Sequence, residues 1–137
     1  MKRLTVVIAT GVVMLLLTSA AWAACAQSDL TGTWLTYQSG TSSDNIGPFF
    51  YWKRCTVRLD SSGFVTGGSC RDDIGDTFSL TTGRIRVTAG CVVTGTVGDP
   101  AGSVVINHGA LDRGKTVFMG VLTDSVNGIA SVQGVKR

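Results

Sequence analysis

Residues 29–37 read DLTGTWLTY and predict the first β-strand of the chain. From Thr33 onward, the odd-numbered side chains alternate with Trp34 and Thr36, which is the two-residue period of a strand with one buried face. Gly32 adds backbone freedom just before the large Trp34 side chain, and this suits a chain entering a β-barrel whose end that side chain fills. We expect the strands downstream to close against this one.

The chain begins with the pattern of an export signal. Lys2 and Arg3 form a basic start, residues 4–17 are an uncharged apolar run, and small residues follow. This layout predicts a secretory signal peptide over residues 1–23, which is cleaved to leave a single domain over residues 24–137. We therefore expect a secreted or periplasmic protein with no membrane span after cleavage.

Two other fates of the leader stay open. Residues 4–24 carry no charge and are long enough to span a bilayer, so an uncleaved anchor is one alternative. Lipidation at Cys25 is the other, because small residues precede this cysteine.

Composition favours strands and argues against a nucleic-acid partner. The chain has no Glu, and Gly, Thr, Ser and Val dominate after the leader, which disfavours helices. The formal net charge is +3, of which Lys2 and Arg3 carry two units, so the exported part is close to neutral. Nucleic-acid binding needs a concentrated basic surface, and we expect none.

Short strands separated by turn residues recur along the exported part, and no amphipathic helix of useful length interrupts them. We predict an all-β fold, an antiparallel up-and-down β-barrel of about eight strands, with a β-sandwich as the alternative. The expected hairpins include one around residues 82–83, between strands 77–81 and 84–88, and one at Asn127-Gly128.

Residues 38–48 are rich in Ser, Gly, Asp and Asn and show no periodicity. They predict a loop of roughly ten residues. Long loops at one end of a barrel commonly carry binding specificity, so we expect this loop to form the mouth of a binding site.

All four cysteines, Cys25, Cys55, Cys70 and Cys91, lie in the exported part. An even count in an oxidising compartment predicts two disulfides, with three possible connectivities. A zinc site is disfavoured, because the chain has no Cys-x-x-Cys pair and only one His. If residues 62–63 form a two-residue hairpin loop, Cys55 lies opposite Cys70 and the pair can be bridged, whereas a four-residue loop would offset them.

An aromatic cluster begins the next strand, which we expect over residues 49–59. Half of its side chains must point outward, so Phe50 and Trp52 are expected to form a mouth, a surface patch or a partner site, or to pack under the preceding loop. Tyr37 on the first strand is a further aromatic candidate for ligand binding.

Two basic residues complete the set of candidate ligand-binding residues. Arg54 shares its strand parity with Arg58, Arg84 and Arg86, which would bind an anion if they faced a lumen and would otherwise coat the outer face of a barrel. His108 ends an alternating strand, on the face of its apolar neighbours, and we expect it to be either half-buried or at the rim.

No pattern in the sequence predicts catalysis, a cofactor or a metal. Asp72, Asp73 and Asp76 lack the spacing of a calcium-binding loop and its closing Glu, so we interpret them as a solvated turn. A nucleophile elbow, a phosphate-binding loop and a dinucleotide fingerprint are all absent from the sequence.

The opening of the first strand resembles that of the calycins, a group of small β-barrels. Leu-Thr-Gly-Thr-Trp at residues 30–34 resembles the avidins, its Gly-x-Trp core resembles the first motif of the lipocalins, and residues 29–34 resemble bacterial metalloprotease inhibitors. The resemblance implies structural roles for Gly32 and Trp34. The Asn and Ser that bind biotin in avidins are replaced here by other residues, so no biotin contact is carried over.

In lipocalins the first-strand Trp packs at the closed end of the barrel, beneath a basic residue near the last strand. Trp34 matches the Trp, and the basic residue is expected to be Lys136 or Arg137. The metalloprotease inhibitors use their N-terminal segment on the protease, and a disulfide at Cys25 would tether that segment here.

We therefore expect an exported, non-enzymatic binding protein, whose ligand is a small apolar molecule or a protein partner. A protease inhibitor or protein-interaction module is one alternative. A structural subunit of the cell envelope, assembled through exposed strand edges, is another.

Overall fold

Nine β-strands and one short 3-10 helix make up the computed structural model, which describes residues 24–43, 47–99, 102–124 and 128–137. The expected signal peptide and Asn127 of the expected hairpin turn lie outside the described residues. The elements are η2 (Gln27–Leu30), β1 (Gly32–Ser43), β2 (Pro48–Leu59), β3 (Val65–Asp72), β4 (Thr77–Ser79), β5 (Thr82–Val87), β6 (Val92–Asp99), β7 (Gly102–Leu111), β8 (Val117–Asp124) and β9 (Ile129–Lys136).

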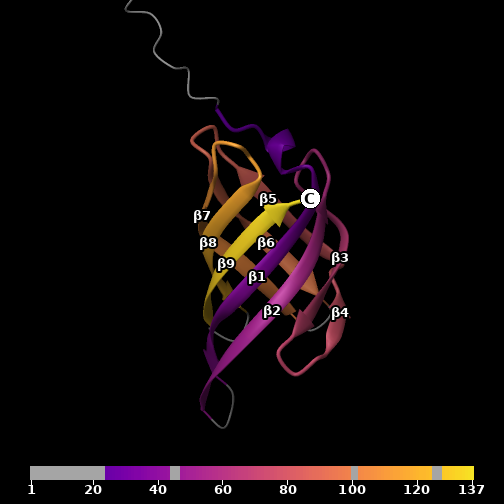
Figure 1. Ribbon diagram of the computed structural model, residues 1–137, viewed down its shortest axis with the longest axis vertical. Helices are drawn as coiled ribbons and strands as arrows, with labels where there is room; N and C mark the ends of the chain where they lie inside the picture. Colours follow the sequence, from indigo (N-terminus) through magenta and orange to yellow (C-terminus); the bar gives the residue numbers. More distant parts are fainter. Residues whose placement is uncertain (1–23, 44–46, 100–101, 125–127) are drawn as a thin grey trace, which may run out of the picture.

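The strands form one antiparallel sheet in the order β4-β3-β2-β1-β9-β8-β7-β6-β5, which curls into a half-barrel (Figure 1). Strands that follow each other in sequence are neighbours in the sheet, except that β1 also pairs with β9, and β4 does not pair with β5. The predicted all-β, up-and-down arrangement is confirmed. The first strand lies inside the sheet, between the second and the last.

The expected hairpin around residues 82–83 is wrong. β4 pairs with β3, and β5 pairs with β6, so the two strands belong to opposite edges of the sheet. Leu80 is buried, and its N–H donates to Gly68 O, while the N–H of Thr81 donates to Gly98 O. The chain crosses from one edge to the other here because the apolar side chain of Leu80 is held in the core.

Both edges of the sheet are short or covered. β4 has only three residues, and β5 meets the β2–β3 turn through a single bridge between Phe64 and Arg84. The N–H of Ile85 donates to Gly63 O, and the side-chain amide of Gln27 accepts from the Val87 N–H and donates to Ile85 O. These contacts satisfy edge groups that would otherwise be open to another chain.

Trp34 fills one end of the half-barrel, as expected, and is 2% exposed. Its Nε1–H donates to Leu30 O at 2.8 Å, and its ring meets Phe118 edge-on with centroids 5.7 Å apart. Lys136 Nζ lies 5.8 Å from the Trp34 ring, the position expected for the basic residue near the last strand. A Cβ on Gly134 would overlap the Phe118 ring, so this end is closely packed.

The disulfides join Cys55 to Cys70 and Cys25 to Cys91. The first pair confirms the expected register, although the expected two-residue loop is wrong. The Asp60 carboxylate accepts the N–H groups of Ser62 and Phe64 in a longer turn, and a register shift next to Leu59 restores the pairing of Cys55 with Cys70.

The expected loop over residues 38–48 is also wrong. β1 continues to Ser43 and pairs with β2 back to Pro48, so the connection is confined to residues 44–47. The polar stretch is a strand because β2 on one side and β9 on the other supply its backbone hydrogen bonds. The resulting β1–β2 hairpin extends beyond the other strands, at the end opposite η2 (Figure 1).

Candidate functional site

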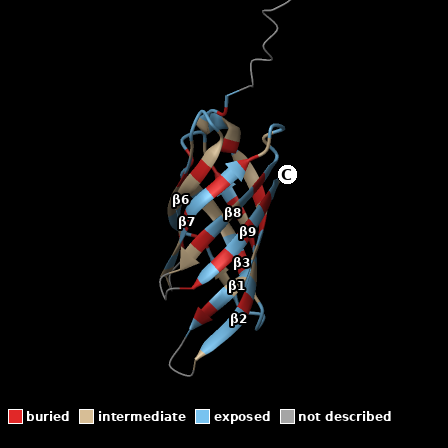
Figure 2. Cartoon of the chain, turned by 90° about the vertical axis from the view of Figure 1, so that its left-hand side faces the viewer, coloured by how far each residue is buried: buried red, intermediate tan, exposed pale blue. Residues whose placement is uncertain are grey.

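The outer surface of β1, β2, β8 and β9 carries exposed aromatic and aliphatic side chains with polar side chains between them, and we name this surface the aromatic face. Alternation along each strand places it on the side opposite the core, as the buried and exposed bands of Figure 2 show. Its members are Tyr37, Ser39 and Thr41 on β1, Phe50, Trp52 and Arg54 on β2, Met119 and Val121 on β8, and Ile129, Ser131 and Gln133 on β9.

Small residues in the middle of the aromatic face form the floor of a groove. Trp52 pairs with Ser39, and Ser39 pairs with Ser131, whose hydroxyl lies 3.3 Å from that of Ser39. The groove has a volume of about 570 Å³, and its walls are aromatic on the β2 side and aliphatic on the β8 and β9 side. Phe50 is 85% exposed and Trp52 is 49% exposed, so both rings face solvent.

Two further hollows adjoin the groove and share Tyr37 and Trp52 with each other. One, of about 290 Å³, also contains Gln133, and the other, of about 350 Å³, contains Arg54 and a set of charged residues on the β3 side. Tyr37 and Arg54 are direct cross-strand partners. The structure therefore brings together four of the five residues predicted as ligand-binding, on an outer face instead of a loop mouth.

His108 is exposed and lies on another strand than these four residues, so the half-buried position expected for it is wrong. The pairing of β7 with β8 shifts register between Ile106 and His108, which turns His108 outward while Ile106 stays buried. His108 pairs with Val121 and lies four strands from Trp52 in the sheet, about 19 Å at ~4.8 Å per strand. The two residues stand at opposite ends of one row of cross-strand partners, so His108 borders the aromatic face at Val121.

The arginines considered for an anion site lie on the outer surface. Arg54, Arg58 and Arg86 are exposed. The guanidinium of Arg84 lies 4.6 Å from the ring centroid of Phe64 and donates to Ser62 O. These positions agree with the alternative expectation, in which the arginines cover the outer face of the barrel.

The aliphatic wall of the groove was not predicted. Residues 117–122 are apolar at positions of both parities, with a Gly among them, and such a run is typical of a strand covered on both faces. That run was the signal for an outer apolar surface on β8. Ile129, 60% exposed, extends it onto β9.

The lumen of the half-barrel is mainly apolar and contains a cavity of about 50 Å³. A water molecule needs about 10–15 Å³ on this measure, so the cavity holds a few waters. Four polar atoms in buried surroundings have no hydrogen-bond partner among the described residues: Thr36 Oγ1, Gln38 Oε1, Ser42 Oγ and Tyr51 Oη. Each such atom costs about 1–3 kcal/mol if it stays unpaired.

Lys53 faces the lumen beside these groups. Its Nζ lies 5.6 Å from the centroid of the Tyr51 ring and 5.3 Å from that of Phe78. Burial of the hydroxyl, together with the charge of Asp124, raises the pKa of Tyr51 above its ordinary value of 10.0. The alternation of β2 was the sequence signal for Lys53, which has the same parity as Cys55.

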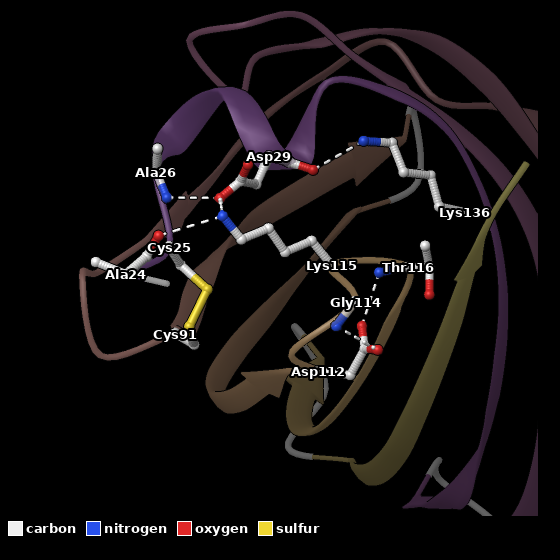
Figure 3. A network of polar contacts seen from close by, with 10 residues as sticks. All are labelled: Ala24, Cys25, Ala26, Asp29, Cys91, Asp112, Gly114, Lys115, Thr116 and Lys136. Carbon is white, nitrogen blue, oxygen red and sulfur yellow. Dashed lines mark hydrogen bonds and ion pairs between the residues drawn. A yellow bond between two sulfur atoms is a disulfide. The ribbon is translucent and has the colours of Figure 1, made fainter. Parts of the chain in front are cut away.

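The opposite end of the lumen is closed by η2 and its polar contacts (Figure 3). Lys115 Nζ forms an ion pair with the Asp29 carboxylate at 2.8 Å and donates to Ala24 O, while Lys136 Nζ donates to Asp29 O. The Ala26 N–H and the Lys115 ammonium both donate to the Asp29 carboxylate and hold its pKa below the ordinary 3.8. Together with the Cys25 disulfide, these contacts lock the N-terminal segment onto the half-barrel.

Asp112 supports this closure by shaping the β7–β8 turn that carries Lys115. Its carboxylate accepts the N–H groups of Val117, Thr116 and Gly114, and these bonds lower its pKa. The turn thereby presents the Lys115 ammonium to η2.

The acidic turn after β3 binds its own backbone. The Asp72 carboxylate accepts the N–H of Asp76. Within the described ranges, no group of three or more His, Cys, Asp or Glu side chains is placed to hold a metal ion.

In the part of the chain that the structure describes, no helix is long and apolar enough to cross a membrane. Neither a protein-family model nor a curated protein sequence matches this chain.

Proposed function

We propose that this chain is an exported, non-enzymatic binding protein that docks a protein partner on the aromatic face. The observation that carries the proposal is the groove between Phe50 and Trp52 on β2 and the aliphatic residues of β8 and β9. Exposed apolar patches that continue over several strands mark interaction sites in soluble proteins.

The composition of the aromatic face fits a protein partner. Protein interfaces are enriched in aromatic residues, Met and Arg, and are depleted of charge at their centre. Here the groove is lined by uncharged residues only, while the charged side chains, Arg54, Arg71, Asp72 and Asp73, lie in the neighbouring hollow. The projecting β1–β2 hairpin leaves the Phe50 end of the face accessible to a large partner (Figure 1).

A small apolar ligand in the lumen is the weaker version of the same function. Pockets for drug-sized ligands have volumes of about 300–1,000 Å³. The cavity in the lumen has about 50 Å³, so such a ligand requires displacement of core side chains.

If the partner is an exported protease, we propose the aromatic face as the contact instead of the N-terminal segment. The Cys25–Cys91 disulfide and the contacts of Asp29 hold residues 25–30 against the half-barrel, and an inserted segment would have to leave these partners. A relationship to the calycins, and to the metalloprotease inhibitors among them, is part of this alternative. The packing of Trp34 beneath Lys136 supports it.

The proposal is tested with the purified, disulfide-bonded protein and the exported proteins of its source, followed by measurement of Kd for each partner identified. Exported metalloproteases form a parallel panel. Trp52→Ala is expected to weaken binding by about 30-fold, because a buried aromatic anchor is worth about 2 kcal/mol or more. Ile74→Ala removes an apolar side chain that is 80% exposed outside the face, and should leave Kd unchanged.

A second variant separates the two contact modes. Ser28→Arg places a bulky charge on the exposed side of η2. Loss of binding in Ser28→Arg with full binding in Trp52→Ala would assign the contact to the N-terminal segment and reject the aromatic face. Retention on a polysaccharide matrix with no protein partner would also contradict the proposal.

A further inference from the structure

The polar groups of the lumen are confined to the end opposite η2. Along β1 the inward side chains change from Trp34 through Thr36 and Gln38 to Ser42, and Tyr51 on β2 pairs with Gly40, between Gln38 and Ser42. Thr36, Ser42 and Tyr51 are 5%, 6% and 8% exposed, and their hydroxyls have no partner among the described residues. Because solvent does not reach these atoms freely, they require a partner inside the lumen.

Lys53 brings a positive charge to the same end. Among the described residues, no carboxylate oxygen lies within 4.0 Å of its Nζ, and its recorded neighbours are the rings of Tyr51 and Phe78. Aromatic faces attract an ammonium group and position it, but they do not neutralise its charge. Gln38 is the cross-strand partner of Lys53, and Thr36, Gln38 and Lys53 line the same cavity.

We propose that this end of the lumen binds a short-chain carboxylate, with Lys53 as its counter-ion. A carboxylate only accepts hydrogen bonds, and the Lys53 ammonium and the unpaired Thr36 hydroxyl, which line the same cavity, are both able to donate. Bonds of this charge-assisted kind are about twice as strong as neutral ones. The rest of the cavity is lined by side chains such as Ile106 and Leu122, which suit a short hydrocarbon tail.

The size of the cavity limits the ligand. About 50 Å³ corresponds to roughly three to five waters, so the ligand has roughly three to five non-hydrogen atoms. Formate, acetate and propionate fall in this range.

This site is independent of the proposed function. Lys53 and Trp52 are consecutive residues of β2 and therefore project from opposite faces of the sheet. A protein docked on the aromatic face does not cover the lumen, and the two sites are tested separately.

The experiment is a titration of the disulfide-bonded protein with sodium propionate, followed by backbone amide NMR shifts and by Tm. Sodium chloride at matched ionic strength and the neutral analogue propionamide are the reference arms. The expected result is a saturable shift of amides in β1 and β2 and a rise in Tm with propionate. Propionamide is expected to bind at least about tenfold more weakly, because it lacks the charge that pairs with Lys53.

Three variants assign the result to the site. Lys53→Met keeps the aliphatic stem and should weaken propionate binding at least about tenfold, and Thr36→Val, which removes the hydroxyl from the cavity lining, should weaken it several-fold. Arg86→Met removes an exposed charge from the outside of β5 and should bind propionate as the parent does. Equal amide shifts with propionate and chloride, or equal propionate binding by Lys53→Met and the parent, would overturn the proposal. It would also be overturned by a structure determined at saturating propionate in which the lumen holds ordered water and no propionate.

Discussion

The two ends of the half-barrel differ in whether their polar groups have hydrogen-bond partners. At the η2 end, Asp29, Lys115 and Gln27 all have hydrogen-bond partners, and these partners tie the N-terminal segment to strands far away in sequence. At the other end, Ser42 and Tyr51 hold buried hydroxyls without partners among the described residues. The polar contacts of the η2 end therefore hold that end closed. The end opposite η2 contains buried hydroxyls that are still able to form hydrogen bonds.

The largest effect should come from opening the closed end. Replacing Cys25 and Cys91 with Ala removes a disulfide between residues 66 positions apart. The gain in loop entropy of the unfolded chain should lower the free energy of unfolding by about 4 kcal/mol. The matched control, Ala at Cys55 and Cys70, removes a link across 15 residues and should cost about 3 kcal/mol. Urea unfolding of both double variants measures the two losses, and a smaller loss at the η2 end would contradict the view that this end is the more strongly locked.

A smaller loss is expected when the closed end is changed without touching its disulfide. Gln27→Ala removes two hydrogen bonds to β5, at Ile85 O and the Val87 N–H, and should lower the free energy of unfolding by about 2 kcal/mol. The same unfolding experiment tests it. An unchanged midpoint would mean that the β5 edge does not depend on η2.

Substitutions at the end opposite η2 should raise the free energy of unfolding instead of lowering it. Tyr51→Phe removes a buried hydroxyl that has no partner among the described residues, and should raise the free energy of unfolding by about 1 kcal/mol in carboxylate-free buffer. Ser42→Ala tests the same point at a second position. Destabilisation by both variants would show that these hydroxyls are already satisfied in the folded protein.

The smallest effects are changes of stability with pH, and they separate the ends. Asp29 has a lowered pKa in the folded protein, so its stabilisation is complete above the ordinary value of 3.8 and is lost as pH falls through the folded pKa. Tyr51 has a raised pKa, so its contribution is complete below 10.0 and is lost as pH rises through the folded pKa.

Unfolding midpoints measured across pH check this pair of signs. In a plot of unfolding midpoint against pH, Asp29→Asn should reduce the fall in stability at acid pH and leave the fall at alkaline pH unchanged. Tyr51→Phe should reduce the fall at alkaline pH and leave the fall at acid pH unchanged. If either variant reduced both falls, the two ends would not be independent.

Much of the fold could be predicted from local patterns. The alternation around Trp34 correctly indicated a strand with one buried face, and the spacing of Cys55 and Cys70 correctly indicated their pairing. The latter succeeded although the turn was wrong, because a register shift compensated for the longer loop. A single error in a turn does not propagate when a bulge absorbs it.

The failures share a physical cause. Residues 38–48 have weak strand propensity, yet β1 persists to Ser43 because β2 and β9 pair with it. His108 was placed by strict alternation, and the shift next to Ile106 reversed it. In both cases, a neighbouring strand that is distant in sequence decided the outcome.

The candidate surface was predictable in part. Trp52 and Phe50 were selected because half of an aromatic strand must face outward, and the parity of the strand placed Arg54 beside them. The groove itself needed Val121 and Ile129, which reach the same surface only because β9 and β8 follow β1 in the sheet.

The sequence alone therefore determined the all-β class and the inward position of Trp34, because each depends on alternation, and it indicated the Cys55–Cys70 link, which the register shift next to Leu59 then made possible. Only the tertiary structure decided that β1 lies between β2 and β9, that Cys25 closes one end, and that Lys53 and the unpaired Thr36 hydroxyl line one cavity. These features arise from contacts between segments far apart in sequence, whose geometry no local pattern specifies.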